Sequence, residues 1–381
     1  MTGIWLIRHG EAEGNLYRRI HGWYDGALTE MGFRQLPFLA QRFQHTRLDA
    51  VYASDLRRAV STAQALAEPR GLRVNCLPEL REVNMGDWED RCWGWVERFC
   101  PEQYRRLNGD PWTWSVPGGE PGEATARRLH AALLRIAEQQ PDREAAVVSH
   151  GSAIRLLLAE LLGCASSDIA RIPYCDNTAV ARILAEDGVL RLESWNDNSH
   201  LPDELSAFHR DEWWKNPDGK DGRDLYYLPM ELESPRGAET YLRRYREAWI
   251  ASYGSDAGFT GIHLEGARYR RRKDPESVLE VWCEETPCGL LELAPDQGAA
   301  EGVGHIALLQ LDEAFRGRGL AVQLLGAAVS YYRSRGRKML RLRVSAENAP
   351  ALRFYRRWGF RTDHEEAGTF GDTYVMLREI P

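Results

Sequence analysis

Long apolar stretches are missing from this sequence. No uninterrupted apolar run approaches the roughly 20 residues that a helix needs to span a bilayer, and the N-terminus has no basic segment followed by a long apolar one. The first absence argues against a transmembrane helix and the second against a secretory signal peptide. We therefore expect a cytoplasmic protein that has no membrane among its partners.

Paired cysteines and an excess of positive charge are missing as well. The seven cysteines include no CxxC pair, so the sequence predicts reduced thiols, no structural zinc site and no metal among the cofactors. The formal net charge is −7, and this acidic balance is atypical of a protein that binds nucleic acid. The sequence therefore predicts no nucleic-acid partner.

The chain length indicates more than one domain. With 381 residues, the chain exceeds what a single hydrophobic core usually serves. The sequence pattern changes near residue 200, where a polar stretch rich in Gly, Pro and Asp begins. We predict a first domain at residues 1–200, a connector at 201–235 and a second domain at 236–381.

The first part alternates short apolar strands with amphipathic helices. Strands are expected at 4–7, 48–54 and 145–149, and helices at 57–68 and 124–139. Such alternation is typical of an α/β fold with a doubly wound, mainly parallel sheet. The second part begins with a helix and continues with a run of strands, which predicts an α+β domain with a mixed sheet.

Two apolar strands of the first part end in the dipeptide His-Gly. The strand at 4–7 runs into "RHG" and the strand at 145–149 runs into "HG", so His9 and His150 each follow a strand end. Ligands bind at the carboxyl ends of strands in open α/β sheets. Arg58 follows a third strand at the start of a helix, where backbone N–H groups already favour an anion.

These features belong to a set of seven motifs in residues 1–200 that resembles the histidine phosphatase superfamily, also called the phosphoglycerate mutase-like family. The motifs read "RHGEAEGN", "GALTEMG", "SDLRRAVSTA", "LREVNMGDWE", "PGGEPGEA", "VVSHG" and "DNTAV". Ala12 departs from the pattern, because the family often has Thr or Ser after "RHGE". The resemblance implies a phosphoglycerate mutase-like fold and phosphoryl chemistry on a small-molecule phosphomonoester.

The resemblance also implies the roles of individual side chains. His9 would accept the phosphoryl group as a phosphohistidine, and Glu82 would protonate the leaving alkoxide and then activate the hydrolytic water. Guanidinium groups suit a phosphate dianion because their fork-shaped donors neutralise its charge. The remaining catalytic residues implied are Arg8, Arg58 and His150. The phosphate-binding residues implied are Arg8, Gly10, Asn15, Arg58, His150 and Gly151.

Two reactions remain open for the first domain. A phosphoglycerate mutase must shield its phosphohistidine from water, and this favours a long insertion that encloses the site. Here only the short stretch 83–116 separates Glu82 from "PGGE". We therefore expect hydrolysis, with mutase-type phosphoryl transfer as the alternative.

The second domain carries a Gly-Arg turn between a strand and a helix. The stretch "RGRG" at 316–319 can aim successive backbone N–H groups at one anion. Together with "NAPALRFYRRWGF", which begins at Asn348, it resembles the GNAT acetyltransferases over residues 236–381. Glu313 stands where that family frequently has proline.

The resemblance to GNAT enzymes implies acetyl-CoA as co-substrate and a small-molecule or peptide amine as acceptor. Tyr355 would protonate the departing thiolate, and His305 is a candidate general base. The cofactor-binding residues implied are Leu309, Leu311, Arg316, Gly317, Arg318, Gly319, Leu320, Ala321, Asn348 and Tyr355. A C-terminal domain that binds acyl-CoA only to regulate the phosphatase is the alternative, and assembly as a homodimer is left open.

Overall fold

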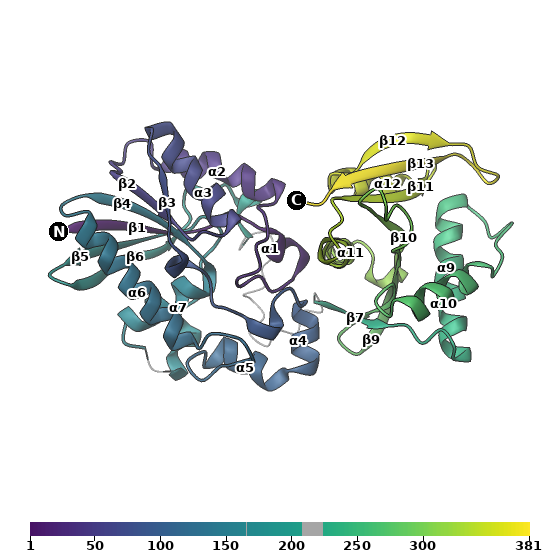
Figure 1. Cartoon of the computed structure of the whole chain (residues 1–381), viewed down its shortest axis with the longest axis horizontal. Coiled ribbons are helices and arrows are strands. Elements are labelled where there is room, and N and C mark those ends of the chain that lie inside the picture. Colours follow the sequence, from purple (N-terminus) through teal and green to yellow (C-terminus); the bar gives the residue numbers. More distant parts are fainter. Residues whose placement is uncertain (165, 208–223) are drawn as a thin grey trace. The chain divides into compact units, whose positions relative to one another are not determined.

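The computed structural model describes residues 1–164, 166–207 and 224–381, which form two compact units (Figure 1). The first unit comprises Met1–Arg91 and Val96–Asp221, and the second comprises Cys92–Trp95 and Gly222–Pro381. The predicted connector falls in part on residues 208–223, outside the described residues. Its described part contains a short 3-10 turn, Asp203–Leu205, and a strand, Leu225–Pro229. The predicted domain boundaries stay a prediction.

The first unit is built on a six-stranded sheet with the order β3-β2-β4-β1-β5-β6. Its strands are β1 (Thr2–Arg8), β2 (Ala50–Ala53), β3 (Val74–Cys76), β4 (Glu144–Ser149), β5 (Val180–Glu186) and β6 (Val189–Asp197). The first four strands in the order pair in parallel, and β5 and β6 add an antiparallel edge. β1, β2 and β4 are buried and apolar, as expected for strands covered on both faces.

Strand β4 lies between β1 and β2 and is parallel to both. The register pairs Arg8 of β1 with Ser149 of β4, and Ala53 of β2 with Val148 of β4. The carboxyl ends of three strands that are far apart in the sequence therefore meet at one edge of the sheet.

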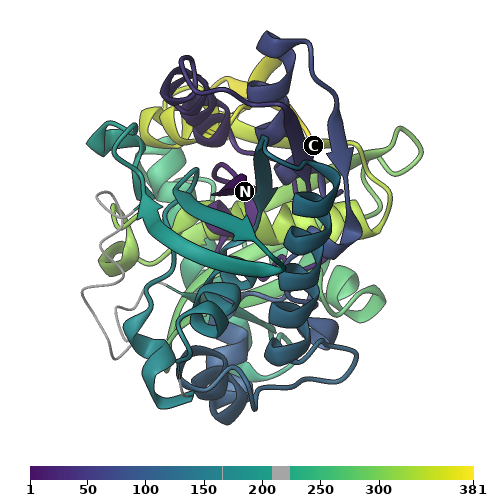
Figure 2. The same cartoon turned by 90° about the vertical axis from the view of Figure 1, so that its left-hand side faces the viewer.

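Helices cover both faces of this sheet. The α-helices among the described residues of this part of the chain are α1 (Glu13–Tyr17), α2 (Glu30–Arg42), α3 (Arg57–Ala67), α4 (Trp93–Phe99), α5 (Pro101–Gly109), α6 (Gly122–Gln139) and α7 (Gly151–Leu161). Figure 1 shows α2 and α3 on one side of the sheet and α6 and α7 on the other, and Figure 2 views the unit from the end where the N-terminus lies. Under α2 and α3, Ile7, Val51 and Val148 pack in one apolar cluster.

The second unit is built on a seven-stranded mixed sheet with the order β12-β13-β11-β10-β9-β8-β7. Its strands are β7 (Leu225–Pro229), β8 (Val278–Cys283), β9 (Thr286–Ala294), β10 (Val303–Leu311), β11 (Met339–Ser345), β12 (Arg361–Glu366) and β13 (Thr373–Glu379). Neighbouring strands are antiparallel except β10 and β11, which run in parallel.

Among the described residues of the second unit there are four α-helices. They are α9 (Pro235–Tyr253), α10 (His263–Lys273), α11 (Ala321–Ser334) and α12 (Ala349–Arg357). In Figure 1, α11 lies on one face of the sheet and α9 and α10 on the other. The Ser234 hydroxyl caps α9 by accepting from the Gly237 N–H, and Gly254, with φ at +76°, ends it. Among the helices of the described residues, none is long and apolar enough to cross a membrane.

The predicted fold classes are confirmed: an α/β unit with a mainly parallel sheet precedes an α+β unit with a mixed sheet. The helix α10 and the edge strand β12 were not predicted. α10 is rich in arginine and buries only Leu264 and Ala267, so its apolar pattern is weak. β12 is exposed along almost its whole length, so its sequence shows no apolar alternation.

Candidate active site

His9 and His150 lie side by side at the sheet edge where β1 and β4 end. Their ring centroids are 5.1 Å apart, and the rings meet at 62°. His9 is 5% exposed and His150 is fully buried. The two His-Gly dipeptides converge because β4 pairs directly with β1. The structure thus brings together the two imidazoles that the sequence predicted to share a site.

The hydrogen bond at His9 fixes which ring nitrogen is free to react. His9 Nδ1 lies 2.6 Å from the carbonyl oxygen of Gly10. Because a carbonyl can only accept, the proton must sit on Nδ1, and the lone pair remains on Nε2. The backbone of His9 is also held, since its N–H donates to Ser149 and its carbonyl accepts from Asn177 Nδ2. A nucleophilic nitrogen is therefore held in place.

Both ring nitrogens of His150 are buried and have no hydrogen-bond partner. The Nε of Arg8 is likewise buried without a partner. Buried polar groups usually have partners, so these atoms indicate a polar ligand at this point. Arg8 Nη1 donates to the Cys175 carbonyl. A Cβ on Gly151 would lie 3.2 Å from Arg8 Nε, so the glycine makes room for the guanidinium.

Arg58 is held by backbone carbonyls. As the second residue of α3, which follows β2, it is 1% exposed. Its Nη1 donates to the carbonyl of Tyr24, and its Nη2 donates to the carbonyls of His21 and Gly22, at 2.8–3.0 Å. Burial lowers the pKa of Arg58 to about 10, so the guanidinium keeps its charge at neutral pH.

Glu82 caps the helix that follows His150. One carboxylate oxygen accepts the N–H groups of Val83 and Ala153, at 2.9 and 2.7 Å, and the other accepts the N–H of Ser152 at 3.0 Å. His150 occupies the N-cap position of α7, but its side chain makes no cap hydrogen bond. The carboxylate of Glu82 therefore caps α7, and this places the carboxylate near His150 at the start of the helix.

Two predicted phosphate ligands use their polar groups within the protein. The N–H of Gly10 donates to the Thr62 hydroxyl at 3.0 Å. Asn15 is exposed, and its Oδ1 accepts the Ala12 N–H at 3.0 Å as part of the cap of α1. Their predicted roles toward phosphate stay predictions.

Both site histidines are kept neutral. Burial, together with the charges of Arg58 and Arg8, holds the pKa of His9 well below its ordinary value. Burial, followed by the charge of Arg58, does the same to the pKa of His150. A neutral His9 can attack phosphorus, and a neutral His150 can still donate one N–H to a phosphoryl oxygen.

These lowered pKa values predict a pH dependence of stability. In the unfolded chain both imidazoles bind a proton near pH 6.5, whereas in the folded chain they stay neutral to lower pH. The unfolded state then binds more protons, so the free energy of unfolding falls below pH 6.5 by about 1.4 kcal/mol per histidine and pH unit, until the folded pKa is reached.

Urea unfolding between about pH 7 and about pH 5.5 measures this slope. His150→Asn removes one of the titrating groups, so its slope is expected to be shallower than that of the wild type, by about 0.7 kcal/mol per pH unit near pH 6.5 and by close to about 1.4 at the acid end of this range. Equal slopes for the two proteins would contradict the lowered pKa of His150.

The stretch 83–116 packs on the loop that carries Glu82. A small pocket of about 10 Å³ is lined by Val83 and Ser152, and also by Leu107 and Trp114. This volume holds about one water molecule. Trp114 packs edge-on against Trp88, with ring centroids 5.7 Å apart. The described residues contain no group of three or more His, Cys, Asp or Glu side chains arranged to hold a metal ion.

In the second unit, the Gly-Arg turn lies between β10 and α11. Gly317 and Gly319 have φ values of +71° and +77°, and nothing lies within 4 Å of the position that a Cβ would take on either residue. The left-handed conformation favours glycine, and the first N–H groups of any α-helix lack an acceptor within the helix. This open, glycine-lined helix start fits the phosphates of acetyl-CoA.

The two parallel strands beside this turn diverge. Within the described residues, the pairing of β10 with β11 ends at Ile306 and Leu342, although β10 continues to Leu311 and β11 to Ser345. The pairing of β10 with β9 shifts register between Ile306 and Leu308 and then continues. Leu309 and Leu311 thus lie on the diverging part of β10, where the sequence predicted an edge for the cofactor.

The other predicted cofactor residues lie around α12. Asn348 caps this helix by accepting the Ala351 N–H at 3.2 Å, and its Nδ2 donates to the Ser252 hydroxyl. Tyr355 packs between Phe354 and Phe360, and burial raises its pKa to about 12. The tyrosine therefore keeps its proton at neutral pH, as an acid must.

His305, the candidate base, is 6% exposed and has a buried Nδ1 without a hydrogen-bond partner. Burial, and then the charges of Arg343 and Arg341, lower its pKa to about 4. Within the folded chain it is therefore a weak base.

The sequence reasoning missed the groups that hold the predicted side chains. The loop from His21 to Tyr24 supplies three carbonyls to Arg58, and Glu89 binds this loop by accepting the N–H groups of Gly22, Trp23 and Tyr24. Glu89 lies in the motif "LREVNMGDWE", so its position was visible in the sequence. The carbonyls left no signal, because every residue has one.

The two imidazoles lie together at one edge of the sheet, and the guanidiniums of Arg8 and Arg58 are near enough to act on their pKa values. The family model of the histidine phosphatase superfamily (branch 1) matches residues 4–198, and that of the acetyltransferase (GNAT) family matches residues 238–360. The chain belongs to the histidine phosphatase superfamily and carries a GNAT domain in its second part.

Individual relatives match the first part of the chain. The probable phosphoglycerate mutase GpmB of Yersinia pestis (strain Pestoides F) is 34% identical over 210 residues, which cover 53% of this chain and 95% of the relative. The solved structure of YhfR from Bacillus stearothermophilus is 28% identical, with a TM-score of 0.51, and the match covers 52% of this chain and 99% of that one. A mycobacterial glucosyl-3-phosphoglycerate phosphatase in complex with VO3 is 28% identical, with a TM-score of 0.48, over 51% of this chain and 99% of that one.

Proposed function

We propose that the first domain hydrolyses small phosphomonoesters through a phosphohistidine on His9. One observation carries this proposal: His9 holds its proton on Nδ1, which leaves the lone pair on Nε2, and it lies beside His150, whose buried ring nitrogens have no hydrogen-bond partner. A nucleophile needs N–H donors nearby to attack a phosphate dianion, because the negative charge of the phosphate otherwise repels its lone pair.

The reaction takes two steps. His9 Nε2 attacks phosphorus while Arg8, Arg58 and His150 bind the equatorial oxygens, the P–O bond to the leaving group breaks, and Glu82 gives the leaving oxygen a proton. The Glu82 carboxylate then takes a proton from water, whose oxygen attacks the phosphohistidine and releases inorganic phosphate. His9 regains its free Nε2, and no metal takes part.

Phosphoglycerate mutase activity is the second candidate, and the name of the Yersinia relative favours it. In that reaction the phosphoryl group on His9 returns to a hydroxyl of the substrate instead of passing to water. The stretch 83–116 provides only the two short helices α4 and α5 to enclose the site. This small cover supports hydrolysis, because a mutase needs to keep water out.

A direct comparison separates the two reactions. The whole protein is incubated with 4-nitrophenyl phosphate and with 3-phosphoglycerate, the latter with and without 2,3-bisphosphoglycerate. We expect release of inorganic phosphate in excess of any 2-phosphoglycerate formed. Conversion of 3-phosphoglycerate to 2-phosphoglycerate without release of phosphate would establish the mutase.

We propose that the second domain transfers an acetyl group from acetyl-CoA to a primary amine. The glycine turn at Gly317 and Gly319 and the start of α11 would hold the pyrophosphate, together with Arg316 and Arg318, and the diverging part of β10 would hold the pantetheine arm. Acetyl-CoA supplies the activated acyl group. Tyr355 then protonates the departing thiolate once the amine has attacked.

Substitution of Gly319 by valine tests this assignment. A β-branched residue at φ +77° is strained by about 1–2 kcal/mol or more, so the turn shifts and acetyl-CoA binding, measured by calorimetry, weakens roughly tenfold. Gly336→Val is the matched control, because Gly336 has φ +72° and equally open surroundings at the other end of α11. Unchanged affinity in Gly319→Val, or equal weakening in both variants, would contradict the assignment. Phosphatase activity should be unchanged in both.

A further inference from the structure

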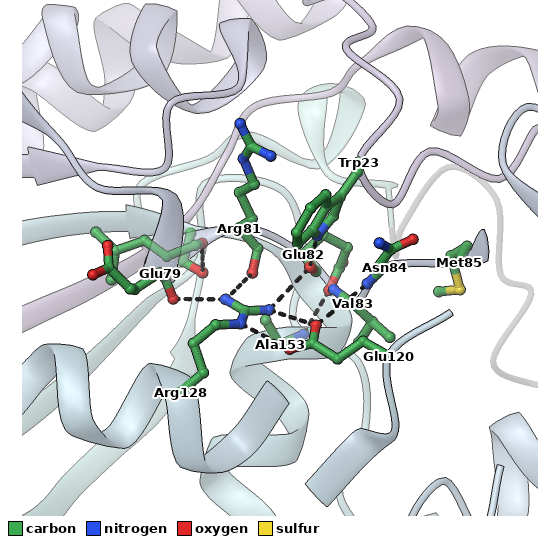
Figure 3. A network of polar contacts seen from close by, with 12 residues as sticks. Trp23, Glu79, Arg81, Glu82, Val83, Asn84, Met85, Glu120, Arg128 and Ala153 are labelled. Carbon is green, nitrogen blue, oxygen red and sulfur yellow. Dashed lines mark hydrogen bonds and ion pairs between the residues drawn. The ribbon is translucent and has the colours of Figure 1, made fainter. Parts of the chain in front are cut away.

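We propose that Arg128 is a positioning residue that holds Glu82 in place for proton transfer. This inference rests on the proposed function of the first domain. Arg128 lies on α6, and its side chain reaches the loop that carries Glu82 (Figure 3). Nothing in the sequence pattern singled it out.

Every N–H of the Arg128 guanidinium is used. Nη1 donates to the carbonyls of Glu79 and Arg81, at 2.6 and 3.1 Å, and Nη2 donates to the carbonyl of Glu82 at 3.2 Å. Nε and Nη2 donate to the two carboxylate oxygens of Glu120, at 2.9 and 2.8 Å. A guanidinium has five N–H donors, so this set of five bonds satisfies it completely.

The bonds matter because the loop has no regular secondary structure. Residues 81–84 belong to no helix or strand, so no regular backbone ladder fixes the peptide planes on either side of Glu82. Arg128 binds the loop at two carbonyls before Glu82 and at the carbonyl of Glu82 itself. Glu120 holds the loop after Glu82, because the Glu120 N–H donates to the carbonyl of Asn84 at 2.9 Å. Trp23 Nε1 is a second donor to the Glu82 carbonyl, at 2.9 Å.

Stability is one role of this arrangement. The side chains of Arg128 and Glu120 are 18% and 17% exposed and pair through two hydrogen bonds, a geometry in which an ion pair can stabilise a fold, but stability does not require that the same guanidinium bind the backbone of Glu82. A general acid, by contrast, must lie within hydrogen-bond reach of the leaving oxygen, and a displacement of about 1 Å costs much of its effect. Three carbonyls bound by one rigid, planar group give that precision, which a flexible ammonium cannot supply.

The electrostatic role of Arg128 is separate from its geometry. Burial is the largest cause of the lowered pKa of His150, followed by the charges of Arg58 and His9. The charge of Arg128 lowers this pKa further. The variant Arg128→Lys keeps the charge while it removes the five-donor fork, so it isolates the geometric role.

The test compares two substrates that depend differently on Glu82. Phenyl phosphate has a poor leaving group and needs the general acid, whereas 4-nitrophenyl phosphate has an activated one. For Arg128→Lys we expect kcat/KM to fall roughly 10- to 100-fold with phenyl phosphate, part of the effect of a general acid, and less than about threefold with 4-nitrophenyl phosphate. Inhibition by vanadate should be unchanged, since the phosphate ligands are intact.

Arg182→Lys is the matched control. Arg182 on β5 makes a bidentate pair with Glu144, at 2.5 and 2.8 Å, near the amino end of β1 and so away from the site. We expect it to lower stability to a similar extent and to affect both substrates equally. Equal losses on both substrates in Arg128→Lys would overturn the proposal.

A crystal structure of Arg128→Lys gives a readout that needs no activity. The carboxylate of Glu82 is expected to leave the N–H groups of Ser152 and Ala153, and its retention there would overturn the proposal. If this variant does not fold, Glu120→Gln is measured in the same two ways, with the same expected results. A wild type that hydrolyses no phosphomonoester would contradict the proposed function, while the crystal structure would still decide the role of Arg128.

Discussion

Replacement of His9 by alanine is expected to abolish phosphatase activity, with a loss of roughly 10³-fold or more in kcat. The variant keeps Arg8, Arg58 and His150, so phosphate still binds, but it has no nitrogen that can take the phosphoryl group. In the wild type, rapid quenching with labelled substrate should trap a phosphoenzyme that is labile to acid and stable to base. The alanine variant should yield none.

His45→Ala is the matched control for this experiment, because His45 is an exposed histidine of the same unit. It should retain full activity and form the phosphoenzyme normally. Turnover by His9→Ala within tenfold of the wild type, or label trapped on that variant, would show that another residue is the nucleophile. Either result would remove the basis of the proposed mechanism.

The second large effect is expected for Glu82→Gln. Glutamine cannot give the leaving oxygen a proton, so kcat/KM should fall by roughly 10²–10⁴-fold with phenyl phosphate and far less with 4-nitrophenyl phosphate. The amide oxygen can still accept from the start of α7, but the amide nitrogen cannot. Some stability is therefore lost, and the ratio between the two substrates corrects for it.

Glu160→Gln controls for the removal of a carboxylate from α7 itself. Glu160 pairs with His130 at 2.8 Å near the other end of that helix. Its substrate ratio should equal that of the wild type. If Glu82→Gln lost the same factor on both substrates, Glu82 would act in binding or folding and another group would have to protonate the leaving oxygen.

The sequence predicted the strand ends of the first domain well, and for a physical reason. A buried parallel strand is a short apolar run, and a polar residue at its end is easy to see. The sequences of the strands did not predict the order of the strands in the sheet. His9 and His150 lie together because β4 is inserted beside β1, and the sequence indicated this only through the shared His-Gly pattern and the family resemblance.

The contacts that hold the site were harder to predict. Arg58 and Arg128 both bind backbone carbonyls, and a carbonyl leaves no mark on the sequence. Asn15 was visible in the sequence, but its role was ambiguous. An asparagine side chain can bind phosphate, and it can also cap a helix, as the Oδ1 of Asn15 does here. A polar residue beside a site therefore has competing uses that only the fold distinguishes.

In the second domain the glycines were more informative than the charged residues. The sequence singled out the turn that contains Gly317 and Gly319, and both glycines adopt left-handed conformations. The region before β8 was the least predictable, because α10 carries its arginines in its second half and buries only Leu264 and Ala267, so its apolar face is hard to recognise. His305, by contrast, lies where it was expected on β10, but its buried surroundings lower its pKa to about 4.

The proposed mechanism requires that two imidazoles and two guanidiniums bind one tetrahedral oxyanion. A crystal of the whole protein soaked with vanadate shows whether they do. We expect vanadium bonded to Nε2 of His9, with its oxygens bound by Arg8, Arg58 and His150. Vanadate bound elsewhere while this cluster stays empty, or bound with His9 out of reach, would contradict it.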